Sequence, residues 1–144
     1  MAGYSGTPLP QKLGIKAGHL IALINAPDGF QATLSPLPDG VSVCDSLPDA
    51  EQADVIVLFT KSLAELRANF KLFAGRLKPD GGLWIGWPKK SSGVATDVSE
   101  NPVPDIGLAA GLVDNKVCAL DDTWSGLRFV YRLADRPKKK AKTK

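Results

Sequence analysis

The sequence is poor in the side chains that bind metals. Its 144 residues include one histidine, His19, and two cysteines, Cys44 and Cys118. The cysteines are far apart in apolar runs, without the close pairing of a metal knuckle or a redox motif. We therefore expect no metal site, and we expect reduced, buried thiols, since free cysteine is among the most buried residue types.

Long apolar runs are also absent. No segment has the length and uniform apolarity of a membrane span, and residues 1–11 lack the charged region and apolar stretch of a secretion signal. The formal net charge is only +3, and much of the excess lies in the lysine-rich tail, residues 137–144. We therefore expect a cytoplasmic protein with no membrane contact, which attracts nucleic acid only weakly and only through its tail.

The glycine motif of nucleotide-binding proteins is missing as well. In such α/β proteins the pattern Gly-x-Gly-x-x-Gly follows the first strand and lets the backbone approach a pyrophosphate. Here the turn after the apolar run 20–24 is Asn25-Ala26-Pro27-Asp28-Gly29-Phe30. Because Pro27 has no N–H donor and fixes its own backbone, this turn cannot form the same cradle of amide groups.

The first 90 residues contain apolar runs typical of strands. Continuous runs at 20–24, 54–59 and 83–87 predict parallel strands that are buried on both faces. The shorter alternating run 41–44 predicts a strand nearer the sheet edge. A brief helical or irregular piece is expected at 30–34.

A helical period separates two of these runs. Apolar side chains recur at helical spacing over 63–77, and Ser62 with Glu65 forms a capping box at the start of this segment. We expect the helix to cross one face of the sheet and to end before a turn at 79–82. Together with the strands on either side it makes a right-handed strand-helix-strand unit.

The last third of the chain predicts a helix and a hairpin. Asn101 followed by Pro102 indicates the start of a helix that ends near Ala110. Residues 112–120 form the next apolar segment, with a polar interruption in its middle. The run 127–132 alternates, so we expect it to be antiparallel to its neighbours.

These elements predict a compact Rossmann-like α/β fold of three layers. Its sheet is mostly parallel and closes with an antiparallel strand at the carboxyl end. We expect one domain over residues 12–134, preceded by a flexible arm at 1–11 and followed by a disordered lysine-rich tail at 135–144.

The order of elements from residue 54 onward resembles the carboxyl half of class I methyltransferases. The most similar segment is Leu77-Lys78-Pro79-Asp80-Gly81-Gly82-Leu83. The resemblance implies a methyltransferase-like fold with S-adenosylmethionine as cofactor. The chain departs from this family at the turn 25–30, where the family has a glycine-rich turn for the amino-acid part of the cofactor. Asp45 is the candidate for the family's ribose-binding acid.

A closer resemblance covers residues 13–132. The combination that carries it is Asn25-Ala26-Pro27-Asp28-Gly29-Phe30, Trp87-Pro88-Lys89-Lys90-Ser91-Ser92-Gly93 and Thr123-Trp124-Ser125-Gly126-Leu127-Arg128-Phe129-Val130. These motifs resemble a family of short stand-alone bacterial proteins of unknown function. The resemblance implies a bacterial cytosolic protein and carries no catalytic assignment.

The loop after the run 83–87 is the best candidate for a binding site. It offers two ammonium groups, two hydroxyls and flexible backbone amides, from Lys89, Lys90, Ser91, Ser92 and Gly93. Ligands bind at the carboxyl ends of strands in open α/β sheets, and these groups suit a phosphate or a carboxylate. The alternative is a solvated loop whose lysines cover neighbouring apolar surface.

Two other turns can line the same cleft. In the turn after the first strand, Asn25 and Asp28 are candidate ligand-binding residues, although both residue types also bond readily to local backbone. The other turn is the hydroxyl-rich segment 123–125. His19 precedes the first strand without an evident partner, so we expect a surface position rather than a general base.

Other notable side chains indicate structure rather than chemistry. Asp121 and Asp122 belong to the segment that is expected to turn the chain into the last strand. Even on a strand, adjacent residues would point to opposite faces, so the two are not expected to act as a carboxylate pair. Trp84, Trp87 and Trp124 are expected in the core or in a cleft wall.

Three hypotheses for function follow. The preferred one is a non-catalytic or regulatory module that binds a small anionic ligand or a protein partner through the loop 89–93. The second is a minimal S-adenosylmethionine-dependent methyltransferase whose cofactor pocket is rebuilt around Pro27. The third is an assembly protein that dimerises through an exposed edge strand or through the face that carries Tyr131.

Overall fold

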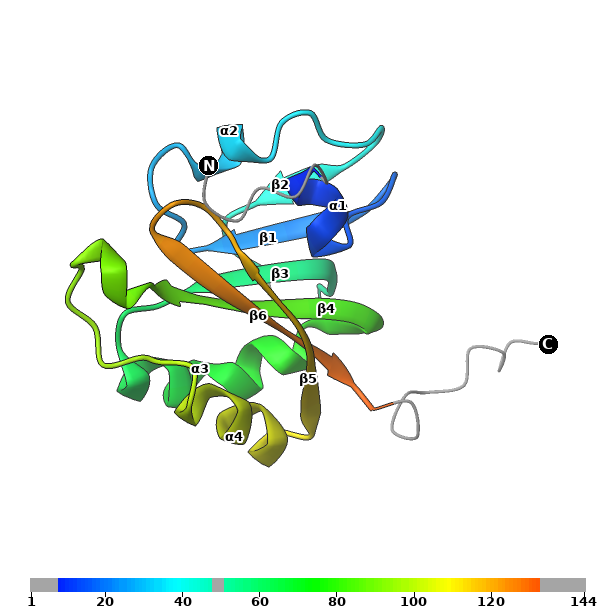
Figure 1. Ribbon diagram of the computed structural model, residues 1–144. Helices are drawn as coiled ribbons and strands as arrows, with labels where there is room; N and C mark the ends of the chain where they lie inside the picture. Colours follow the sequence, from blue (N-terminus) through cyan, green and yellow to red (C-terminus); the bar gives the residue numbers. More distant parts are fainter. Residues whose placement is uncertain (1–7, 48–50, 133–144) are drawn as a thin grey trace.

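The structure is a computed structural model, which describes residues 8–47 and 51–132. Within these residues one mixed sheet is covered by helices on both faces (Figure 1). The strands are β1 (Leu20–Ile24), β2 (Ser42–Cys44), β3 (Ala53–Phe59), β4 (Leu77–Pro88), β5 (Leu112–Ala119) and β6 (Trp124–Tyr131). The helices are α1 (Leu9–Leu13), α2 (Phe30–Thr33), α3 (Leu63–Gly75) and α4 (Pro102–Ala109), with a short 3-10 turn, η1 (Lys90–Ser92).

The strands lie in the order β2-β1-β3-β4-β6-β5. The first four of these are mutually parallel. β6 runs antiparallel between β4 and β5. The predicted Rossmann-like fold, with a mostly parallel sheet and an antiparallel closing strand, is confirmed.

One face of the sheet is covered by α3 and α4, which lie side by side (Figure 1). The apolar stripe of α3 packs onto the sheet through Leu66 and Phe70, and the Phe70 ring meets Phe129 of β6 edge-on at 5.1 Å. The Ser62 hydroxyl accepts a hydrogen bond from the Glu65 N–H at 3.2 Å, as the capping box predicts. The helix ends two residues earlier than predicted, because Leu77 already belongs to β4.

The other face has much less helix. It is covered by α1 and by the single turn of α2, and aromatic side chains fill the space between them. Phe30 meets Phe59 edge-on at 4.8 Å, and Phe59 meets Trp124 at 5.1 Å. Trp84 is fully buried and donates its indole N–H to the Leu13 carbonyl at 3.2 Å, which fastens α1 to the sheet. All three tryptophans are buried, so the prediction that they lie in the core or in a cleft wall is confirmed.

The turn predicted at 79–82 is wrong, because these residues lie within β4. The pairing of β3 with β4 is irregular here, between Ala53 and Val55. A side chain at Gly81 would collide with the Asp54 carbonyl, and one at Gly82 would collide with the Arg128 guanidinium. The two glycines therefore allow the neighbouring strands β3 and β6 to approach β4 closely, and they do not reverse the direction of the backbone.

The hairpin of β5 and β6 agrees with the prediction, except that β6 begins at Trp124 rather than at residue 127. The polar interruption in β5 is a bulge between Asp114 and Lys116, and the strand continues through it. Asp121 and Asp122 lie in the turn, as predicted, and the Asp121 carboxylate accepts the N–H groups of Thr123 and Trp124 at 2.8 and 2.7 Å. That aspartate therefore stabilises the turn.

The chain ends are only partly described. Residues 9–11, placed in the flexible arm by the sequence, belong to α1, where Pro10 is buried. Residues 1–7 and the predicted tail at 135–144 lie outside the described residues. Among the described residues, every helix is too short or too polar to cross a membrane.

Removal of the α3 cap tests this description of the fold. We expect Ser62→Ala to lower the free energy of unfolding by about 1 kcal/mol, because the Glu65 N–H loses its acceptor. Ser62→Asn should keep most of the stability, since asparagine also caps helices. Urea unfolding measures both variants, and an equal loss for alanine and asparagine would contradict the role of the cap.

Candidate functional site

A large cavity lies where β1 and β2 end, at the carboxyl edge of the sheet. Its volume is about 690 Å³. The turn after β1 and the residues at the end of β2 form most of its wall: Leu23, Asn25, Ala26, Pro27, Asp28, Gly29, Phe30, Gln31, Val43, Cys44 and Asp45. We call it the β1–β2 cavity. In open α/β sheets this edge is where ligands bind.

The turn in the wall of the β1–β2 cavity is tightly folded. Asn25 has a positive φ of 60°, and Gly29 has a φ of 83°. The Pro27 carbonyl accepts the N–H of Phe30 at 3.1 Å, and Phe30 is the first residue of α2. The Asn25 side chain donates to the Phe59 carbonyl at 3.5 Å and so links the ends of β1 and β3. The turn is therefore built by local backbone bonding and by one contact between strands.

The charge in the wall of the β1–β2 cavity is negative. Asp28 and Asp45 are its carboxylates, and no lysine or arginine is among its lining residues. Such a wall attracts cationic groups and accepts hydrogen bonds from hydroxyls, but it repels phosphate. Asn25 and Asp28 therefore line a cavity, but its charge does not suit an anionic ligand.

The two lysines of the predicted loop line a separate cavity of about 520 Å³, here called the lysine cavity. Lys89 and Lys90 share its wall with Trp87 and Ser125, and Ser125 comes from the hydroxyl-rich turn that the sequence places beside them. Asp97 and Glu100 lie in the same wall. The lysine cavity therefore has balanced charges and shares no lining residue with the β1–β2 cavity.

The remaining residues of the predicted loop form a turn. The Ser92 hydroxyl donates to the Lys89 carbonyl at 2.6 Å and accepts the N–H of Val94 at 3.2 Å. Gly93 follows with a φ of 78°. Ser91, Ser92 and Gly93 are absent from the walls of both cavities. The residues predicted as one site are thus divided between two cavities and a turn.

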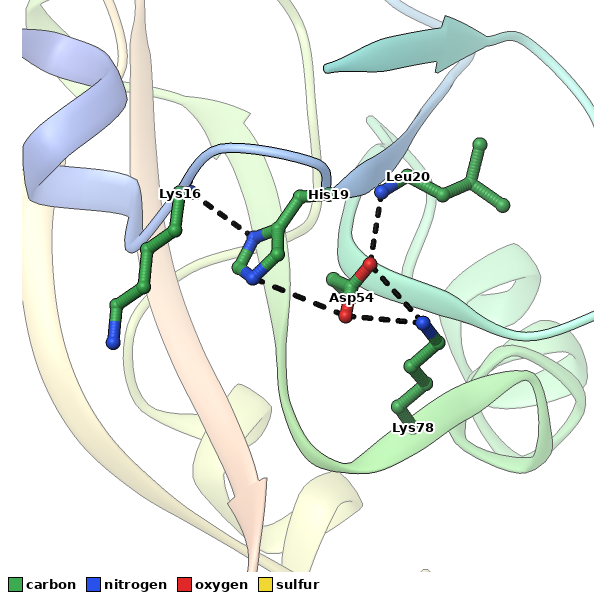
Figure 2. A network of polar contacts seen from close by, with 5 residues as sticks. All are labelled: Lys16, His19, Leu20, Asp54 and Lys78. Atoms are coloured by element: carbon green, nitrogen blue, oxygen red, sulfur yellow. Dashed lines mark hydrogen bonds and ion pairs between the residues drawn. The ribbon is translucent and has the colours of Figure 1, made fainter. Parts of the chain in front are cut away.

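The structure also shows a polar cluster that sequence analysis missed. It lies at the opposite edge of the sheet, where β1, β3 and β4 begin (Figure 2). The Asp54 carboxylate accepts the Leu20 N–H at 2.8 Å and pairs with the Lys78 ammonium at 3.3 Å. The His19 Nε2 atom lies 3.9 Å from the same carboxylate, while its Nδ1 atom accepts the Lys16 N–H at 3.1 Å. His19 therefore has a partner 35 positions away, which no local pattern indicates.

Both cysteines are half-buried, rather than fully buried as predicted. Cys44 lies in the wall of the β1–β2 cavity, and its thiol donates to the Ile21 carbonyl at 3.6 Å. Burial raises the pKa of the Cys44 thiol, and it also raises the pKa of Cys118. Both thiols are therefore poor nucleophiles near neutral pH. Within residues 8–47 and 51–132, no three metal-binding side chains gather at one point.

Comparison with known proteins gives likenesses of structure alone. No protein-family model matches this chain, and no curated protein matches it. The N-methyltransferase NodS from Bradyrhizobium japonicum WM9 superposes with a TM-score of 0.59 at 17% identity, over 84% of this chain and 90% of that one. The magnesium protoporphyrin IX methyltransferase ChlM from Synechocystis PCC 6803, solved with bound SAH, gives 0.58 at 12% identity, over 81% and 75% of the two chains.

A third likeness is to a complex from Haloferax volcanii. It contains the Trm112 methyltransferase activator and a putative methyltransferase, and the matched chain gives a TM-score of 0.60 at 11% identity, over 86% of this chain and 87% of that one. At such low identities the likeness shows the fold and nothing more. The chain therefore has the Rossmann-like fold of class I methyltransferases, as the order of its elements predicts. The resemblance to a family of unknown function stays a prediction.

The two lysines of the lysine cavity offer a test of their structural role. Lys90 is exposed and Lys89 partly so, and we expect the double variant Lys89→Ala/Lys90→Ala to change the free energy of unfolding by less than about 0.5 kcal/mol. Trp87→Ala in the same wall should cost about 3–5 kcal/mol, because Trp87 is only 6% exposed. If the lysine variant failed to fold, the lysines would be structural and would not form a binding site.

Proposed function

We propose that this chain is a minimal methyltransferase-like protein that binds S-adenosylmethionine in the β1–β2 cavity. The observation that carries the proposal is the wall of this cavity, where the turn after β1 meets Asp45 after β2 without any cationic side chain. The likeness in fold to methyltransferases, one of them solved with SAH, supports the same assignment.

The position of Asp45 supports binding of a ribose. In dinucleotide-binding folds an acidic side chain about 20 residues beyond the first turn accepts hydrogen bonds from ribose hydroxyls. Asp45 follows Asn25 by 20 positions and lies beyond the end of the neighbouring strand β2. Its carboxylate would take the same role here.

The charge of the cavity distinguishes between adenosine-containing ligands. S-adenosylmethionine carries a sulfonium, an ammonium and one carboxylate, so its net charge is positive. Asp28 and Asp45 attract such a ligand, whereas they repel the phosphates of ATP or NAD. The volume of about 690 Å³ lies within the usual range for small-molecule sites, about 300–1,000 Å³. The residues present therefore fit this cofactor better than a nucleotide.

The altered turn changes how the cofactor would be held. Pro27 has no N–H, so the turn offers fewer amide donors to a carboxylate than a glycine-rich turn does. Asp28 lies in the same turn and would attract the ammonium group of the ligand. When bound, S-adenosylmethionine supplies an electrophilic methyl group. The residues of this chain bind and orient it through Asp45, Asp28 and the turn.

Thermal unfolding tests the proposal. S-adenosylmethionine at a hundredfold excess over its dissociation constant should stabilise the chain by about 2.7 kcal/mol, whereas ATP and NAD should not. Asp45→Asn should weaken the response, because a neutral amide is a poorer acceptor for two hydroxyls. Asp39→Asn is the matched control, since Asp39 is exposed and is not among the lining residues. No shift with any adenosyl compound would remove the methyltransferase hypothesis.

Cys44 provides an independent probe of the same cavity. Because its pKa is raised above the ordinary value, little thiolate is present at pH 7, and alkylation by iodoacetamide should accelerate as the pH is raised into the alkaline range. Bound S-adenosylmethionine should slow the alkylation of Cys44 at fixed pH. It should leave Cys118 unaffected, because that thiol lies on β5, the outermost strand on the side of the sheet away from β2, and is not among the residues that line the cavity. Peptide mass spectrometry measures both rates, and equal protection of the two thiols would count against ligand binding in this cavity.

The second candidate function is a non-catalytic module that binds a small anion or a protein partner at the lysine cavity. Lys89 and Lys90 in its wall favour this function, while Asp97 and Glu100 reduce the attraction for anions. The expected signature is stabilisation by phosphate that disappears in Lys89→Ala/Lys90→Ala, with no response to adenosyl compounds. Thermal unfolding of the unaltered chain and of the double lysine variant, each with phosphate and with S-adenosylmethionine, distinguishes this function from the first.

A further inference from the structure

A third cavity lies at the amino-terminal edge of the sheet and has a different character. Its volume is about 290 Å³. Four cationic side chains from separate segments line it: Lys12 of α1, Lys16 of the following loop, Lys116 of β5 and Arg128 of β6. Two carboxylates, Asp54 and Asp80, lie in the same wall together with His19. We call it the amino-edge cavity.

The negative charge of Asp54 is already compensated by groups around it. Its carboxylate pairs with the Lys78 ammonium at 3.3 Å and accepts the Leu20 N–H at 2.8 Å. Lys78 does not belong to the cavity wall. The four cations therefore exceed the remaining charge of Asp80, and the wall as a whole is positive. Figure 2 shows the His19 ring between Lys16 and Asp54, so that Lys16 does not pair with this carboxylate.

The Arg128 guanidinium lies close to the backbone at Gly82. A Cβ atom at Gly82 would collide with this group, and a Cβ at Gly14 would lie 3.7 Å from its Nη2 atom. The glycine at position 82 therefore lets the guanidinium lie against β4, and Gly14 at the end of α1 is within ordinary contact distance of it. A planar, positioned guanidinium beside flexible ammonium groups is the arrangement that proteins use to bind phosphate oxygens.

From these observations we infer that the amino-edge cavity is a second binding site, which takes a small oxyanion of the phosphate or phosphate-monoester class. The volume of about 290 Å³ is at the lower end for ligand sites, about 300 Å³, and so favours a phosphate group over a whole nucleotide. The site is independent of the proposed function, since it lies at the opposite edge of the sheet from the β1–β2 cavity and shares no lining residue with it.

The experiment is a titration of the ¹⁵N-labelled full chain with inorganic phosphate at constant ionic strength, followed by amide chemical shifts. We expect saturable shifts for the amides of residues 14–19 and 80–82. The variant Lys16→Ala/Lys116→Ala removes two exposed lysines from the wall. It should weaken phosphate binding roughly tenfold or more, because each charge-assisted contact contributes at least a factor of this order.

The matched control is Lys61→Ala/Lys71→Ala, which removes the same charge from exposed positions outside the amino-edge cavity. It should bind phosphate as the unaltered chain does. Equal weakening in both variants would mean general charge attraction, and shifts centred on residues 88–101 would assign the ion to the lysine cavity. Either result would overturn the inference.

The same titration distinguishes this site from the proposed function. Lys16→Ala/Lys116→Ala should keep its full response to S-adenosylmethionine, because neither lysine lines the β1–β2 cavity. A chain that binds phosphate at residues 14–19 but ignores adenosyl compounds would support this inference while removing the methyltransferase hypothesis.

Discussion

The pairing of β3 with β4 is the interaction on which the rest of the structure depends. The paired residues Ile56 and Leu83, and Val57 and Trp84, are all buried, although successive side chains point to opposite faces. Apolar surface on both faces requires cover on both, and α3, α4 and the short helices α1 and α2 provide it. Each cavity described above lies beyond the part of the sheet that the helices cover, at the carboxyl or the amino ends of the strands.

The unequal cover of the two faces explains where the β1–β2 cavity forms. α3 has 13 residues, whereas α2 on the other face has four. With so little helix, the second face is closed by the rings of Phe30, Phe59 and Trp124 in edge-on contact. Because Phe30 begins α2 directly after the turn 25–29, no further helix covers this turn, and it lines the cavity together with the ends of β1 and β2. The shortness of α2 therefore leaves room for a ligand there.

Local sequence patterns predict the helices and strands well, but they do not predict which side chains of different elements come into contact. The apolar runs place β1 and β3 correctly, and the capping box places the start of α3, because each depends on residues close in sequence. The glycines at 81 and 82 indicate a turn in the sequence but lie within a strand, since glycine serves both turns and close packing.

Only half of the candidate site is predictable from the sequence, for a related reason. Lys89 and Lys90 line a cavity as predicted, but Ser92 bonds to its own loop. The approach of Asp54 to His19 depends on the register of β1 against β3, which periodicity alone does not determine. The same holds for the cluster at the amino-terminal edge, where two cations come from residues 12–16 and two from residues 116–128, at least 100 positions further along the chain.

The bulge in β5 has a consequence for solubility. β5 is the outer strand on its side of the sheet, so its unpaired backbone groups, beside the exposed Val117, would invite pairing with a strand of another molecule. The irregular step between Asp114 and Lys116 interrupts the regular row of amide and carbonyl groups, and covering these two charged side chains with an apolar neighbour would cost their hydration. The opposite outer strand, β2, has only three residues. Both borders of the sheet thus resist the strand-to-strand stacking that leads to fibres.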